Sequence, residues 1–208
     1  MSPLYGGLIA LGASLILIVL YAFSFRKGGI SVQKMVLIGM LLALAITVSM
    51  FEGMIPDFIV PGFKLGFANI VILIILYGLG WKEALFVDVL RVLLTTLLRG
   101  TFLSMGGAMS FAGMALSFLG MFLLYLLWKK CSIIFVSIIG AILHDVGQIL
   151  VAFFFMENSL IFTYLPLMVL VSFGTGALAG IIAHQILRRN LIQRYKSKSG
   201  EENQAAKE

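Results

Sequence analysis

The sequence predicts an all-α fold, a polytopic bundle of transmembrane helices, and three observations support this. The 208 residues are 61% hydrophobic and only 12% charged, with a mean hydropathy of +1.10, whereas soluble domains carry about 25% charged residues. The apolar stretches are much longer than the roughly 10-residue alternating strands of a membrane β-barrel. Backbone polar groups in a bilayer must be satisfied within their own segment, which favours helices.

Charged residues and clusters of glycine and proline divide the chain into seven apolar segments. They cover residues 4–25, 34–51, 65–80, 83–99, 104–128, 132–156 and 160–187. A full span needs about 20 residues, with roughly 17 as the lower limit. The first segment and the last three meet this easily, and the second is borderline. The third and fourth are short and joined by a tight turn, so we expect them to be tilted less than average or one to be partly re-entrant.

The first segment differs from a signal peptide. No positive charge precedes it, and its apolar run is longer than the about 7–15 residues of a signal peptide. We therefore predict an additional transmembrane helix in residues 1–30, a six-helix membrane domain in residues 31–190 and a polar tail in residues 191–208.

The distribution of lysine and arginine predicts the orientation in the membrane. Lys64 and Arg99 are the only basic residues in one set of loops, and the other set, with the tail, contains Arg26, Lys27, Lys34, Lys82, Lys129, Lys130, Arg188, Arg189, Arg194, Lys196, Lys198 and Lys207. Lysine and arginine are enriched in cytoplasmic loops. We therefore predict a multi-pass protein of a bacterial cytoplasmic membrane, with its N-terminus outside and its C-terminus in the cytoplasm. On this basis the net charge of +6 reflects orientation, and we expect no nucleic-acid partner.

The outer loop between the second and third segments, residues 52–69, has an unusual composition. Pro56 and Pro61 prevent a continuous helix, yet the loop stays largely apolar between its charges. Two interpretations are equally compatible with it. The loop could fold back over the helix ends as a cap, or it could lie at the interface with Phe58 and Phe63 as anchors.

Polar side chains inside the predicted spans are the main functional signal, because such residues are costly and tend to face the bundle interior. Asp88 and Arg91 lie three residues apart and share a helix face. The sixth segment carries His144, Asp145 and Gln148. Depth along the helices places Arg91 level with Asp145, so Arg91 could pair with either aspartate, and we favour Asp145.

These groups allow a structural and a functional interpretation. In the first, Asp88, Arg91 and Asp145 form an internal ion-pair clamp between helices. In the second, an outward-open solute cavity is lined by Glu52, Lys64, Asn69, Arg91, Arg99, His144 and Gln148. The three cations would suit an anionic solute, since arginine binds phosphate and carboxylate with two hydrogen bonds. Asp145 and His144 lie about 100° apart around the helix, so we assign Asp145 to internal pairing and His144 with Gln148 to the cavity floor.

Small residues recur at helical spacing on the second segment, at Gly39, Ala43 and Thr47. Such stripes allow close contact between helices. The stripe could pack within the protein's own bundle, or it could dock a helix of a partner subunit.

Several catalytic and cofactor motifs do not occur. The sequence has no phosphate-binding GxxxxGK[ST] loop, no aspartate-rich diphosphate motif and no metal-ligand cluster, and it contains one cysteine, Cys131. A haem held by two histidines is disfavoured, because His144 is predicted near mid-membrane and His184 near the cytoplasmic face. We therefore expect a protein that is not an enzyme and that holds no metal or cofactor.

Three stretches resemble the signatures of the Gx transporter family, whose members are often labelled heptaprenyl diphosphate synthase component I. They are PGFKLGFANI (61–70), RVLLTTLLRGTFLS (91–104) and GAILHDVGQI (140–149). The resemblance covers residues 34–187 in order. It departs from the expected His-Asn pattern at His144-Asp145, which adds a charge.

This family is similar in size and topology to the substrate-binding S components of energy-coupling factor (ECF) transporters. The resemblance implies a binding site capped by loop 52–69, and a stripe at Gly39, Ala43 and Thr47 that docks on a transmembrane coupling subunit working with ATPases. It also implies an anionic vitamin- or cofactor-like solute such as a flavin. Two alternatives remain open: an accessory membrane component of prenyl diphosphate synthesis, and a structural subunit of a membrane redox or transport complex.

Overall fold

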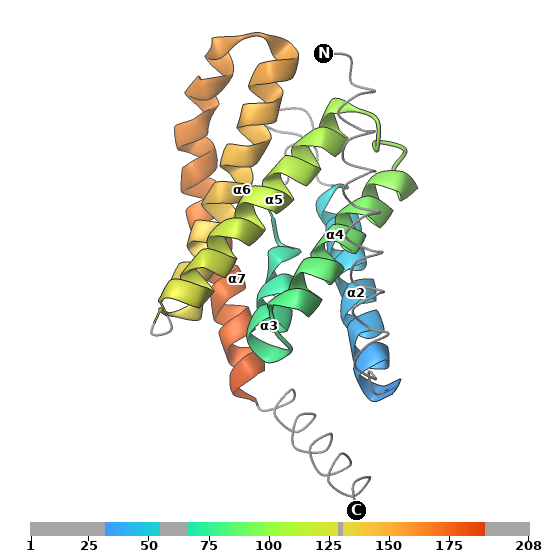
Figure 1. The fold of residues 1–208 in the computed structure, drawn as a ribbon. Helices are drawn as coiled ribbons and strands as arrows, with labels where there is room; N and C mark the ends of the chain where they lie inside the picture. Colours follow the sequence, from blue (N-terminus) through green and yellow to red (C-terminus); the bar gives the residue numbers. More distant parts are fainter. Residues whose placement is uncertain (1–31, 55–65, 129–130, 190–208) are drawn as a thin grey trace, which may run out of the picture.

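The computed structural model describes residues 32–54, 66–128 and 131–189 (Figure 1). Within these ranges the chain is helical and contains no strand. The elements are α2 (Val32–Glu52), α3 (Asn69–Gly78), α4 (Trp81–Leu98), α5 (Met105–Leu127), α6 (Ile133–Met156), the 3-10 helix η1 (Ser159–Tyr164) and α7 (Leu165–Arg188). The predicted first helix, the middle of loop 52–69 and the polar tail lie outside the described residues.

Four helical stretches are long and apolar enough to cross a membrane. They are α2, α5, α6 and the continuous stretch of η1 and α7, Ser159–Arg188. These lengths and compositions confirm the predicted all-α multi-pass membrane protein. The observed bounds of α2, α5, α6 and α7 lie within a few residues of the predicted segments.

The third predicted segment is not a full span, because α3 has only ten residues. A helix of that length rises about 15 Å, which is half of a bilayer's hydrocarbon core of about 30 Å. Positive backbone φ angles mark both approaches to the helix, 77° at Gly66 before it and 131° at Gly80 after it, and glycine adopts this conformation readily. The structure therefore has a short helix enclosed by the bundle at Asn69–Gly78, which neither of the two expectations described.

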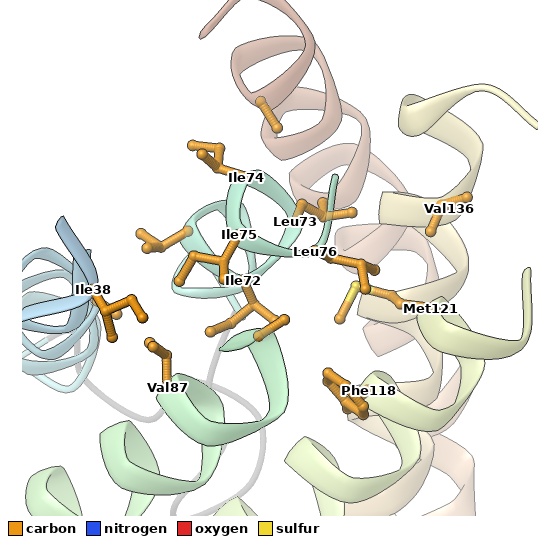
Figure 2. Packing of buried hydrophobic residues seen from close by; sticks show 14 residues of the cluster. Ile38, Ile72, Leu73, Ile74, Ile75, Leu76, Val87, Phe118, Met121 and Val136 are labelled. Atoms are coloured by element: carbon orange, nitrogen blue, oxygen red, sulfur yellow. The ribbon is translucent and has the colours of Figure 1, made fainter. Parts of the chain in front are cut away.

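The short helix α3 forms the centre of the main apolar core. Its side chains at Ile72, Leu73, Ile75 and Leu76 are fully buried. Around them, Figure 2 shows one residue or more from each of four other helices, namely Ile38 of α2, Val87 of α4, Phe118 and Met121 of α5 and Val136 of α6. Because α3 is surrounded by other helices, it can be hydrophobic on nearly every face.

Helices α5, α6 and α7 approach one another closely at glycines. A Cβ atom on Gly147 of α6 would lie 2.6 Å from the Ala112 carbonyl oxygen of α5. On α7, a Cβ atom on Gly180 would lie 2.6 Å from the Cα atom of Ile134. Small residues at such points let helix backbones pack tightly in membranes. Gly147 therefore serves helix packing.

Helix α2 buries fewer residues than α6 and adds polar contacts with α4. Its buried residues are limited to Ile38, Ala45, Ser49 and Glu52. At one end the Lys34 ammonium group lies 2.5 Å from the Glu83 carboxylate. At the other end the guanidinium group of Arg99 donates to the Met50 carbonyl oxygen at 3.4 Å. These contacts attach α2 to α4 at both ends.

Candidate functional site

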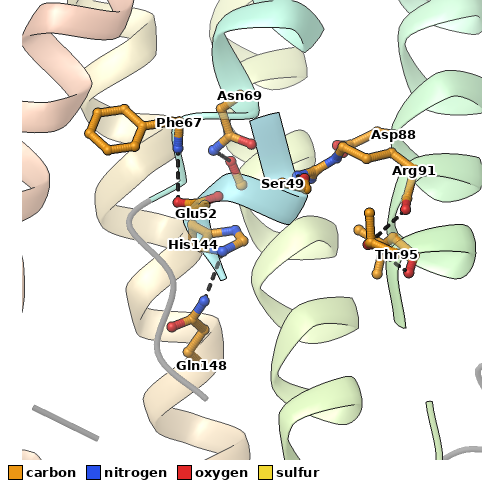
Figure 3. Close-up of polar contacts among 11 residues, drawn as sticks. Ser49, Glu52, Phe67, Asn69, Asp88, Arg91, Thr95, His144 and Gln148 are labelled. Atoms are coloured by element: carbon orange, nitrogen blue, oxygen red, sulfur yellow. Dashed lines mark hydrogen bonds and ion pairs between the residues drawn. The ribbon is translucent and has the colours of Figure 1, made fainter. Parts of the chain in front are cut away.

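The buried polar side chains form two neighbouring groups (Figure 3). We call the first the Arg91 clamp, which consists of Ser49, Asp88 and Arg91. We call the second the polar cluster, which consists of Glu52, Asn69, Ser117, His144 and Gln148. All eight side chains are buried, and Ser49 and Glu52 lie three residues apart on α2, so one helix face touches both groups.

The Arg91 clamp joins α4 to α2 and balances the charge of Arg91. The Nε and Nη2 groups of Arg91 donate to the same Asp88 oxygen at 3.1 and 2.6 Å. The Nη1 group donates to the Ser49 hydroxyl at 3.0 Å. Charge-assisted hydrogen bonds of this kind are about twice as strong as neutral ones. The predicted pair of Asp88 and Arg91 is therefore present.

The favoured pair of Arg91 with Asp145 is wrong. Helix α4 packs against α2, α3 and α5 rather than against α6, which carries Asp145. The Asp145 carboxylate accepts a hydrogen bond from the Ser172 hydroxyl of α7. Depth along a helix gives the height of a residue in the bundle, but it does not give the neighbours of that helix. Equal depth therefore did not bring these two residues together.

The polar cluster begins at the entry to α3. The Glu52 carboxylate at the end of α2 accepts the backbone N–H of Phe67 at 3.0 Å. The side-chain amide of Asn69 donates to the Ser117 hydroxyl of α5 at 3.1 Å. Within the described residues, the Asn69 Oδ1 atom has no hydrogen-bond partner. The first turn of α3 is thus fixed from both sides, and one buried acceptor remains available.

His144 and Gln148 complete the polar cluster from α6. Their side chains meet at 2.8 Å between His144 Nε2 and Gln148 Nε2, one turn apart. Two glycines make room for the imidazole: a Cβ atom on Gly113 would lie 2.9 Å from its Cε1 atom, and one on Gly66 would lie 3.9 Å from its Cδ2 atom. Figure 3 shows Glu52, Asn69, His144 and Gln148 in one region of the bundle.

Asp145 and His144 point in different directions from α6, as predicted, whereas the role of His144 and Gln148 as a cavity floor stays a prediction. Asp145 faces α7 through Ser172, whereas the His144 ring lies against Gly113 of α5. The partner of Asp145 is therefore a hydroxyl group in place of the expected guanidinium.

The three predicted cations are not gathered at one point. Arg91 is balanced by Asp88. Arg99 is half-buried, and its guanidinium group occupies the space where a side chain on Gly53 would begin. There it lies near the negative end of the α2 dipole. Lys64 lies outside the described residues, so a solute cavity that includes it stays a prediction.

The predicted docking stripe of Gly39, Ala43 and Thr47 is exposed along its length. A Cβ atom on Gly39 would meet no other atom within 4 Å. The Thr47 hydroxyl donates to the Ala43 carbonyl oxygen at 2.9 Å, so this polar group is satisfied within its own helix. Within the described residues, Gly39 therefore has no packing neighbour and the stripe is open. A partner that covers it stays a prediction.

Sequence reasoning missed the hydroxyl groups that complete each contact. Ser49 binds Arg91, Ser117 binds Asn69, and Ser172 binds Asp145. Ser49 could have been found, because it shares a helix face with Glu52. Ser117 and Ser172 carry no such signal, since each lies in an apolar helix. In the described part of the chain, no three His, Cys, Asp or Glu side chains are placed to hold a metal ion.

Comparison with known proteins gives one match. A sequence profile of the family described as heptaprenyl diphosphate synthase component I matches residues 41–186, which cover α2 from its second half to the end of α7. Neither the curated proteins nor the solved structures give a significant match. The matched residues include every member of the Arg91 clamp and of the polar cluster. The chain therefore belongs to the membrane protein family described as heptaprenyl diphosphate synthase component I.

Proposed function

We propose that this protein is the membrane-embedded, solute-binding subunit of an ECF-type transporter. The observation that carries the proposal is the polar cluster, which brings side chains from α2, α3, α5 and α6 together inside an apolar bundle. Buried polar groups in membrane proteins are costly and commonly mark solute or ion sites. An internal clamp explains Asp88 and Arg91, but it does not explain the Asn69 Oδ1 acceptor, which has no partner among the described residues.

The proposed solute is an anionic, cofactor-like molecule such as a flavin phosphate. The amide and imidazole groups of Asn69, His144 and Gln148 suit the hydrogen-bonding edge of a planar polar ring. Since Arg91 is balanced by Asp88, the negative charge of the solute would be met by Arg99, whose guanidinium group lies beside Gly53, and by Lys64 of loop 52–69. In this arrangement the ring lies deep and the anionic group lies near the predicted outer surface.

The exposed stripe on α2 supports the proposal that a partner subunit docks there and supplies the energy for transport. The sequence contains no ATP-binding loop, so transport against a gradient would require other subunits. The stripe lies on the outward side of α2, and Ser49 and Glu52 lie on the buried side. The same helix therefore connects the proposed docking face to both polar groups.

Ligand binding is tested by purifying the full chain in mild detergent and identifying co-purifying molecules by mass spectrometry. Isothermal titration with the identified molecule then compares the wild type with Asn69→Ala and His144→Ala. We expect each substitution to weaken binding at least tenfold, about 1.4 kcal/mol. The matched control is Gln185→Ala, which removes an exposed amide on α7 and should change nothing. Unchanged affinity in both site variants would exclude the polar cluster as the binding site.

Docking is tested by two tryptophan substitutions at exposed glycines. A Cβ atom added to Gly39 of α2 or to Gly174 of α7 would have no neighbour within 4 Å among the described residues, so neither substitution should disturb the backbone packing of those residues. We expect wild type and Gly174→Trp to co-purify with a membrane coupling subunit and ATPases, and Gly39→Trp to lose them. Equal recovery of these subunits with both variants would contradict docking on the stripe.

The family description favours a second candidate, an accessory component of prenyl diphosphate synthesis. Such a protein would raise the activity of a soluble prenyl diphosphate synthase. The test is synthase activity with magnesium and prenyl diphosphate substrates, with and without this protein in lipid. Stimulation that survives Asn69→Ala would support this candidate over solute binding.

A further inference from the structure

Asp145 is a buried carboxylate with no ion-pair partner among the described residues. Only 1% of its surface is exposed. Its Oδ2 atom accepts the Ser172 hydroxyl, and its Oδ1 atom has no hydrogen-bond partner among the described residues. Asp145 belongs neither to the ion pair of Lys34 with Glu83 nor to that of Arg91 with Asp88. A hydroxyl donor alone leaves a full negative charge in an apolar interior, which is strongly unfavourable.

The helices that pack against α6 offer no compensating charge near Asp145. Helices α3 and α5 contain no Asp, Glu, Lys, Arg or His, and neither does η1. On α7 the nearest cationic candidates are His184 and Arg188, which lie 12 and 16 residues beyond Ser172, about 18 and 24 Å along the helix.

The ionisable groups close to Asp145 are Glu52 of α2 and His144 beside it on α6. The Glu52 carboxylate interacts electrostatically with Asp145 and repels its negative charge. The His144 ring points toward α5 and Gln148, whereas Asp145 points toward α7. The Glu52 carboxylate therefore makes a negative charge on Asp145 less favourable.

We propose that Asp145 is a proton-binding site between α6 and α7, distinct from the solute site. The proton adds to the Oδ1 atom and gives a neutral carboxylic acid, while Oδ2 keeps its contact with Ser172. On release the carboxylate re-forms and the proton returns to water, with no change in oxidation state. Protonation removes the uncompensated charge from the α6–α7 interface and ends the repulsion of Glu52.

The experiment measures thermal unfolding of the full chain in lipid nanodiscs from about pH 5 to about pH 9, at constant ionic strength. Protons bound by the folded state and not by the unfolded state make stability depend on pH. We expect the melting temperature of the wild type to fall as pH rises, because ionised Asp145 has no counter-charge. Asp145→Asn, which imitates the neutral acid, should lose at least half of that change. Glu157→Gln, at an exposed carboxylate that ends α6, should retain it.

Further variants assign the effect and exclude a purely structural role. Glu52→Gln and His144→Gln should each retain most of the pH dependence; if either abolishes it while Asp145→Asn does not, the proposal is overturned. Curves for Asp145→Asn and wild type that run parallel would also overturn it, because a structural contact is lost equally at every pH. If Asp145→Asn does not fold, the same measurement is made on Ser172→Ala. A shift in the pH midpoint of its melting-temperature curve supports the proposal, and an unchanged pH midpoint contradicts it. No solute is added, so failure here leaves the proposed transport function untouched.

Discussion

The α5–α6–α7 side of the bundle and the α2–α4 side are held together by different means. Between α6 and its neighbours, glycines such as Gly147 and Gly180 bring backbones into contact. Between α2 and α4, side chains such as Arg91 and Lys34 reach across to form hydrogen bonds and ion pairs. Close packing makes a rigid pair of interfaces, whereas polar contacts hold a helix at a few points. The difference suggests that α2 is the helix better able to shift against the rest.

The largest effect is expected from breaking the Arg91 clamp. Arg91→Met leaves the buried Asp88 carboxylate without a cation, and loss of one partner of a buried pair costs about 3–5 kcal/mol. The free energy of unfolding in SDS measures this. The double variant Asp88→Leu with Arg91→Met removes both charges and should recover at least half of the loss. A cost below about 1 kcal/mol for Arg91→Met would show that the clamp does not hold α2.

The second largest effect is expected from a substitution in the glycine-packed contact between α5 and α6. Gly147→Ala places a methyl group against the backbone of Ala112 and Gly113, and overpacking of this kind costs about 3 kcal/mol. Gly174→Ala is the matched control on α7, because its added methyl group meets no neighbour. The control should be neutral or stabilising by up to about 1 kcal/mol, since alanine favours helix. Equal unfolding free energies for the two variants would refute close packing at Gly147.

A smaller effect is expected from Ser49→Ala. The substitution removes the acceptor of Arg91 Nη1 but leaves the pair with Asp88, so the loss should be about 1 kcal/mol. The same SDS unfolding measurement applies. The effect should disappear in the Asp88→Leu, Arg91→Met background, where the donor is gone. An undiminished loss in that background would mean that Ser49 acts through some other contact.

The smallest effect is expected at the partly exposed ion pair of Lys34 with Glu83. Their side chains are 28% and 13% exposed, and partly solvated ion pairs contribute about 0.5 kcal/mol. Lys34→Gln should lower the melting temperature slightly at low salt and less at high salt, because salt screens exposed charges. A large and salt-independent loss would show that this end of α2 is fixed as firmly as the Arg91 end.

The sequence was sufficient to predict where the long helices begin and end, but not which apolar segments cross the bilayer. The extents of α2, α5, α6 and α7 follow from long apolar runs bounded by charges, glycine and proline. Residues 65–80 are an apolar run slightly shorter than the limit of roughly 17 residues, and the structure shortens the helix further, to Asn69–Gly78. An apolar run of this size has the same composition whether it crosses a bilayer or lies inside a bundle, so composition could not distinguish the two.

In the candidate site, the buried polar residues could be predicted from the sequence, but their partners could not. Which residues are polar and buried could be predicted, because an apolar helix can carry Asn69, Asp88, Arg91 or His144 only where other groups compensate them. The prediction also placed Asp145 and His144 on different faces, since that angle is a property of one helix. Partners such as Ser117 and Ser172 are single hydroxyls on distant helices, and nothing in their local sequence distinguishes them.

The sequence by itself determined an all-α membrane protein with buried polar groups on its third, fourth and sixth apolar segments. Only the tertiary structure decided that Arg91 pairs with Asp88 and that Asp145 faces Ser172. The physical reason is that a helix sets the height and direction of its own side chains, whereas helix packing sets which directions meet. Here α3 and α5 lie against α4, and the arginine and the second aspartate end on different interfaces.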